Sequence, residues 1–129
     1  MSLGSGQLLA SAVRTASVSS NDIDAADARG VQVIVNVTAD PAAAETIAVQ
    51  VEGKDPVSGN YFPITAFAAV ADTVTPSTEI YTLYPAILET GTVANSQISS
   101  APVPRTFRVK VTHSASGSWT YSVAYSLLP

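Results

Sequence analysis

The side chains in this 129-residue sequence best suited to chemistry are three carboxylates that lie close together. Asp22, Asp24 and Asp27 follow Asn21, and a hard cation such as Ca²⁺ takes several oxygen ligands from a loop. The spacing matches no standard calcium-binding loop. Asp and Asn before an alanine-rich segment are commonly caps that accept backbone N–H groups, so we expect a structural role. Whether Asp22, Asp24 and Asp27 also bind a cation stays open at this point.

Other catalytic arrangements lack the residues they need. The chain has no cysteine and one histidine, which excludes disulfides, thiol nucleophiles and any site built from two imidazoles. His113 follows Phe107, Val109 and Val111 along one apolar face, so we expect it to be packed or bonded to a loop. No Gly-x-Ser-x-Gly sequence marks one serine as a nucleophile. We therefore predict that the protein is not an enzyme and has no catalytic, cofactor-binding or metal-binding residue.

The charge balance argues against nucleic acid as a partner. Six Lys and Arg residues against ten Asp and Glu residues give a net charge of −4, whereas binding to a phosphate backbone relies on clustered cations. Arg105, Arg108 and Lys110 lie close together, yet only Arg108 and Lys110 share the polar face of the predicted strand. Two such cations suit a salt bridge or a solvated strand face, so we expect no nucleic-acid partner.

Composition also bears on membranes and on surface burial. No apolar run approaches the roughly 18 to 20 residues that span a bilayer, so we expect neither a membrane anchor nor export by a signal peptide. Charged residues make up 12% of the chain, about half the usual share. A surface so poor in charge indicates either burial against a partner or a β-protein rich in Ser and Thr.

Apolar residues recur at every second position in four segments, which is the pattern of strands with one buried face. These segments are 31–38, 46–52, 105–113 and 119–127. Weaker strands are predicted at 8–18, 60–67, 78–84 and 92–98. The sequence Gly53-Lys54-Asp55-Pro56, followed by Gly59, indicates a hairpin turn.

These elements predict an all-β fold, a single-domain antiparallel β-sandwich with about seven or eight strands, either Ig-like or jelly-roll-like. The domain is expected to span residues 8–129, after a flexible N-terminal arm at residues 1–7. The predicted core consists of Val33, Val35, Ile47, Val49, Val51, Phe107, Val109, Val111, Tyr121 and Val123.

The order of several sequence segments resembles a known group of proteins. Asn-Asp-Ile-Asp-Ala-Ala-Asp-Ala-Arg-Gly (21–30) leads into the valine-rich strand, and Val-Glu-Gly-Lys-Asp-Pro-Val-Ser-Gly-Asn-Tyr-Phe (51–62), Tyr-Thr-Leu-Tyr-Pro (81–85) and Pro-Arg-Thr-Phe-Arg-Val (104–109) follow. Over residues 8–128 this set resembles small structural proteins encoded among the head genes of tailed bacteriophages, several of which are capsid decoration (cement) or head-fibre proteins. The motifs are turn and strand signatures, so the resemblance transfers no functional residue to a position here.

The resemblance implies a role in the virion. It implies a non-enzymatic protein, made in the host cytoplasm, that binds the major capsid protein on the capsid exterior, stabilises contacts between its subunits and forms homotrimers. The alternative is a head-fibre, tail or adhesion module that binds carbohydrate. For such a module, aromatic side chains would offer stacking faces: Tyr61, Phe62, Tyr81, Tyr84 and Trp119. An inward-facing Trp119 would remove the best of these platforms.

Segments outside the strongest strands are predicted to contact the capsid protein or sister subunits. They are Ser2–Ala12 and Ala94–Pro104, together with Asp22–Arg29. We expect these contacts to include edge-strand addition, in which backbone amides supply affinity.

Overall fold

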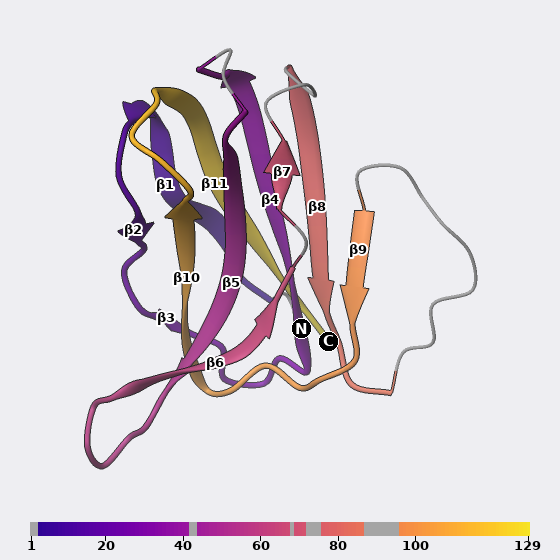
Figure 1. Ribbon diagram of the computed structural model, residues 1–129. Helices are drawn as coiled ribbons and strands as arrows, with labels where there is room; N and C mark the ends of the chain where they lie inside the picture. Colours follow the sequence, from indigo (N-terminus) through magenta and orange to yellow (C-terminus); the bar gives the residue numbers. More distant parts are fainter. Residues whose placement is uncertain (1–2, 42–43, 68, 72–75, 87–95) are drawn as a thin grey trace.

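The chain folds as two β-sheets packed on each other (Figure 1). The computed structural model describes residues 3–41, 44–67, 69–71, 76–86 and 96–129. One sheet has the order β1 (Ser5–Arg14), β11 (Trp119–Leu128), β4 (Gly30–Ala39), β8 (Ser77–Leu83) and β9 (Ser96–Ser99). The other has the order β2 (Val18–Ser19), β10 (Thr106–His113), β5 (Thr46–Lys54) and β6 (Tyr61–Ala66), with β3 (Ile23–Asp24) paired to β10 and β7 (Val70–Ala71) paired to β5.

The predicted all-β sandwich is confirmed, with two differences. The described residues form eleven strands, a few more than predicted, because β2, β3 and β7 are pairings of only two residues. All strand pairs are antiparallel except β8 with β9, which is parallel. Of the strand predicted at 92–98, residues 96–98 belong to β9, and residues 92–95 lie outside the described part of the chain.

No helix in the described ranges is long and apolar enough to cross a membrane.

The strand order is that of a jelly roll. Leaving aside β9 and the short strands β3 and β7, the pairs β1–β11, β2–β10, β4–β8 and β5–β6 are nested inside one another along the chain. A chain paired in this way is one long hairpin that folds over on itself, so that two of its pairs lie in each sheet. Of the two architectures that the sequence left open, the connectivity is therefore jelly-roll-like.

The core fills the space between the sheets with the alternating apolar residues of both. All ten predicted core residues are fully buried. Trp119 joins them from β11, which confirms the alternation predicted for 119–127, and Tyr81 and Leu83 join them from β8. Burial of this apolar surface is the main stabilising contribution to the fold.

The N-terminal boundary differs from the prediction. Residues 5–7, assigned by the sequence to a flexible arm, belong to β1, where Ser5 pairs with Ser126 and Gln7 with Ala124. These residues join the sheet through backbone hydrogen bonds to β11, so the sequence shows no apolar alternation that would reveal the strand. The register shifts twice between Gln7 and Ala12, which marks β-bulges in this edge strand. The predicted strand 8–18 is thus divided between β1 and β2.

Candidate functional site

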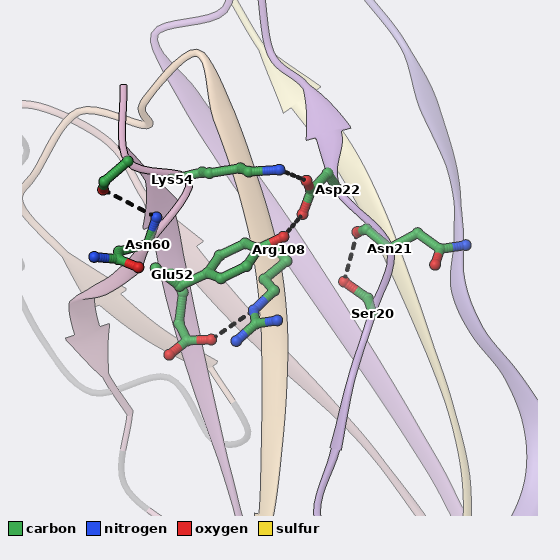
Figure 2. Close-up of polar contacts among 9 residues, drawn as sticks. Ser20, Asn21, Asp22, Glu52, Lys54, Asn60 and Arg108 are labelled. Atoms are coloured by element: carbon green, nitrogen blue, oxygen red, sulfur yellow. Dashed lines mark hydrogen bonds and ion pairs between the residues drawn. The ribbon is translucent and has the colours of Figure 1, made fainter. Parts of the chain in front are cut away.

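Charged and aromatic side chains meet on the outer face of the β10–β5 sheet, next to the β5–β6 hairpin. Lys54 Nζ lies 2.9 Å from Asp22 Oδ2, and the Tyr61 hydroxyl donates to the other carboxylate oxygen of Asp22 at 2.5 Å. Figure 2 shows Lys54 reaching across to Asp22 in the segment before β3. The hydrogen bonds from Tyr61 and then Lys54 lower the pKa of Asp22, and the same bond to Asp22 raises the pKa of Lys54.

Arg108 links this group to Glu52 across the neighbouring strand. Its Nε donates to Glu52 Oε1 at 2.8 Å (Figure 2). Its guanidinium lies 3.4 Å from the centroid of the Tyr61 ring. Arg108 and Glu52 are register partners, so the antiparallel pairing itself brings them together. Both side chains are mostly covered, at 24% and 11% exposure. The charges in this network are therefore paired with one another.

The carboxylates that the sequence grouped together point to different partners. Asp22 binds Lys54 and Tyr61, whereas the Asp24 side chain accepts the Ala26 N–H at 2.9 Å, as expected of a cap. Asp27 has a φ of 68°, the left-handed conformation that Asp tolerates in turns. Within the described ranges, no three His, Cys, Asp or Glu side chains gather where they could hold a metal ion.

His113 lies at the opposite end of β10, against β11 and β1. Its Nε2 is 2.8 Å from the Tyr121 hydroxyl, and its Nδ1 is buried with no hydrogen-bond partner among the described residues. The Arg14 guanidinium stacks on the Tyr121 ring at 4.8 Å and donates to the Tyr121 carbonyl at 2.7 Å. Burial, and then Arg14, lower the pKa of His113, while Glu45 opposes that shift. Burial raises the pKa of Tyr121 to about 12.

A cavity of about 480 Å³ opens beside the β5–β6 hairpin. Its lining residues are Lys54, Asp55, Pro56, Phe62, Pro104, Arg105 and Thr106. Gly53 lets two of the lining residues approach its backbone closely, because a Cβ there would lie 2.6 Å from the Phe62 ring and 3.0 Å from Pro104. The sequence predicts the hairpin but not the cavity. A glycine inside an alternating strand, where backbone and side chain approach closely, is the signal that could have found it.

Most of the aromatic residues considered as stacking platforms are covered. Trp119 and Tyr81 are buried in the core, at 0% and 1% exposure. Arg108 covers one face of Tyr61, and the Tyr84 hydroxyl donates to the Pro129 carbonyl at 2.6 Å. Phe62, at 44% exposure, is the large exposed aromatic residue in the described part of the chain. The inward Trp119 removes the best platform of the carbohydrate-binding alternative.

The outer face of the other sheet is free of charge. The outward side chains of β4, β8 and β11, three strands described in full, are Gln32, Ile34, Asn36, Thr38, Thr78, Ile80, Thr82, Thr120, Ser122, Ala124, Ser126 and Leu128. Ala124, Ile34 and Ile80 are register partners and form an apolar row across the middle. We call this surface the uncharged face.

The segments predicted to make contacts have different places in the fold. Within Ser2–Ala12, residues 5–12 form most of the edge strand β1. Ala94–Pro104 supplies the other edge strand of the same sheet, β9, and then Pro104 in the cavity wall. Asp22–Arg29 contains β3, which pairs with β10. Two of the three segments therefore flank the uncharged face.

No protein-family model matches the chain, and no curated protein matches it either.

Proposed function

We propose that the protein is a non-enzymatic virion structural protein that binds the outside of a phage capsid as a decoration (cement) protein. In this role it stabilises contacts between major capsid protein subunits and associates with further copies of itself as a homotrimer. The resemblance of residues 8–128 to phage head proteins supports the proposal. The jelly-roll connectivity is compatible with it, since viral capsid proteins use this fold, although a fold alone does not define a function.

The observation that carries the proposal is the uncharged face. Covering a charged side chain in an interface costs several kcal/mol unless it finds a partner, whereas Ser, Thr, Asn and Gln are covered at a much lower cost. Ile34, Ile80 and Ala124 add apolar surface at its centre. The face is thus a surface on which a protein partner can lie without desolvating an ion.

The size and shape of this face also suit binding to a lattice. Its three strands, spaced about 4.8 Å apart, give a surface about 14 Å across, which is modest for a stable complex. A modest contact is sufficient where many identical sites are presented side by side, because linked copies gain avidity without one tight site. The edge strands β1 and β9, which border the face, belong to the segments predicted to contact the capsid.

Phage heads assembled without this protein provide the test. Purified protein is added, and the number of bound copies per head is measured by sedimentation and gel densitometry. We expect saturable binding and greater resistance of the decorated heads to heat or chelator. If the intact protein does not bind heads, the decoration proposal fails, and a head-fibre or tail location takes its place.

A matched pair of variants assigns the binding surface. Asn36→Lys and Thr112→Lys each place a cation at an exposed outward position of a strand, on opposite sheets. Because an unpaired charge in an interface is costly, Asn36→Lys should lower the affinity for heads at least about tenfold. Thr112→Lys should leave it within about twofold. Equal binding by both variants would show that the uncharged face is not the contact surface.

A further inference from the structure

The cavity beside the β5–β6 hairpin has walls that the fold holds in place. In the hairpin loop, the Asp55 carboxylate accepts the Val57 N–H at 2.9 Å and the Ser58 hydroxyl at 2.7 Å. The Gly59 N–H donates to the Asp55 carbonyl at 2.8 Å, with Gly59 at a φ of 77° that glycine adopts readily. The loop therefore needs little ordering when a ligand binds.

The opposite wall is held in the same manner. It consists of Pro104, Arg105 and Thr106, where the chain enters β10. The Arg105 carbonyl accepts the Ala25 N–H at 2.6 Å, and just before this wall the Val103 N–H donates to the Arg29 carbonyl at 3.1 Å. Both walls are thus tied to the body of the sandwich, and the cavity is already formed in the free protein.

The lining combines apolar rings with cations. Pro56, Phe62 and Pro104 give the cavity flat apolar surfaces, and its volume of about 480 Å³ lies in the range of small-ligand sites. Lys54 and Arg105 are the cationic lining residues. The Lys54 ammonium is already paired with Asp22 at 2.9 Å, and the Asp55 carboxylate is turned toward its own loop. Arg105 is the more available cation, because its ion pair with Asp24 is loose at 3.7 Å and its side chain is 79% exposed.

The nature of the lining selects among ligands. A sugar needs many hydroxyl partners, but Thr106 is the one neutral hydroxyl among the lining residues. A nucleic acid would need more cations than these two. A ligand with an apolar side chain and a neighbouring carboxylate fits this lining better. The apolar side chain would pack on Phe62 and the two prolines, and the carboxylate would pair with Arg105.

We infer that this cavity is a recognition site for a protein segment in which a large apolar side chain adjoins an acidic residue. This site is separate from the uncharged face and goes beyond the proposed function, since it requires no capsid. The segment places its apolar side chain on the Phe62 ring and its carboxylate at the Arg105 guanidinium.

Blocked tetrapeptides test this inference on the full chain. The probe is acetyl-Gly-Leu-Glu-Gly-amide, and the controls are the same peptide with Lys in place of Glu, the same peptide with Ser in place of Leu, and glucuronate. Backbone amide shifts of the ¹⁵N-labelled protein are followed by NMR up to about 10 mM ligand, a range that detects weak sites. We expect saturable shifts around Lys54, Phe62 and Thr106 with the Leu-Glu peptide and about fivefold weaker binding of the Leu-Lys peptide. The Ser-Glu peptide and glucuronate should not saturate.

Variants assign the two halves of the site. Phe62→Ala should abolish saturation by the Leu-Glu peptide. Arg105→Gln, on an exposed side chain that the fold does not need, should bring the Glu and Lys peptides within about twofold of each other. Lys110→Gln removes a cation from β10 outside the cavity and should change neither the binding of the Leu-Glu peptide nor its preference over the Leu-Lys peptide. Saturation by glucuronate but not by the peptide, an equal response to the Glu and Lys peptides, or shifts elsewhere on the surface would each overturn the inference. None of these outcomes affects the head-binding test.

Discussion

The β10–β5 sheet carries Glu52, Lys54, Arg108 and Lys110 on its outer side, whereas the outward residues of β4, β8 and β11 include no charged side chain. Both sheets alternate apolar and polar residues in the same way and enclose one core. The difference lies entirely in the chemistry of the polar positions.

On the outer side of the β10–β5 sheet, which we call the charged face, most charged side chains already have partners. Arg108 is held by Glu52 and Tyr61, and Lys54 by Asp22, so a partner covering this face would have to replace contacts that already exist. The uncharged face has no ion to desolvate. The two surfaces thus have similar strand geometry but very different costs of being covered, and this contrast separates a self-contained surface from one suited to a partner.

The largest expected change in the free energy of unfolding comes from the core, which lies beneath both faces. Phe107→Ala removes a fully buried ring from β10 and should lower the free energy of unfolding by about 3 to 5 kcal/mol, through lost transfer energy and the cavity left behind. Urea unfolding followed by Trp119 fluorescence measures this loss. Thr106→Ala, at the adjacent outward position, serves as the control and should cost little. Equal losses at both positions would contradict the alternation.

The next effect probes the charged face alone. Arg108→Ala leaves the Glu52 carboxylate mostly covered without its partner and removes the cation from the Tyr61 ring, so we expect a loss of about 1 to 2 kcal/mol. The estimate is below that of a fully buried pair because water reaches both side chains. Arg105→Ala, at an exposed cation nearby, should leave the urea midpoint unchanged. A similar loss of stability in both variants would show that the contacts of Arg108 with Glu52 and Tyr61 stabilise the fold no more than any other positive charge does.

A third effect depends on pH and arises at the His113 end of β10. The folded pKa of His113 lies below its ordinary value of 6.5, so the unfolded chain binds a proton more readily. Stability from this group is therefore fully present above about pH 6.5 and is lost as the pH falls through that value toward the folded pKa. Melting temperatures between about pH 5 and pH 8 should show this decrease. His113→Gln should flatten the curve in that window, and an unchanged curve would exclude His113 as the cause.

The smallest effect concerns the uncharged face. Thr78→Lys adds a charge at an exposed outward position of β8 and, in the free protein, should change the free energy of unfolding by no more than about 0.5 kcal/mol. Thermal melting measures it. A loss above about 1 kcal/mol would mean that the absence of charge serves the fold, and the contrast between the faces would then carry no information about a partner.

Alternation alone predicted the sandwich and its core because burial on one face imposes a period of two wherever a strand is half covered. The same signal placed Trp119 on the inward face of β11. It failed at residues 5–7, since Ser5, Gly6 and Gln7 pair through their backbones and bury no apolar side chain. It also could not choose between Ig-like and jelly-roll-like connectivity, which depends on pairings between strands at opposite ends of the sequence.

The candidate sites were less predictable, because their residues come from distant segments. Asp22, Tyr61 and Arg108 meet only when the segment before β3, the hairpin and β10 are assembled. The three aspartates looked like one cluster in the sequence, but backbone geometry sends Asp22 and Asp24 to different partners. Arg108 was placed correctly on a polar strand face, yet its partner Glu52 follows from a register that no local pattern determines.

The nested pairing of the strands has a consequence for how the chain is made. In one sheet β11 lies between β1 and β4, and in the other β10 lies between β2 and β5. β10 and β11 leave the ribosome after the strands on either side of them, so each sheet is joined only once these two strands have been made. Until they are synthesised, β1 and β4 have no common neighbour, and a nascent chain exposes unpaired strand edges. Completion of the sandwich should thus follow the synthesis of β11. A translation product truncated before β10 contains the pairs β4–β8 and β5–β6 but lacks the strands that join them to β1 and β2.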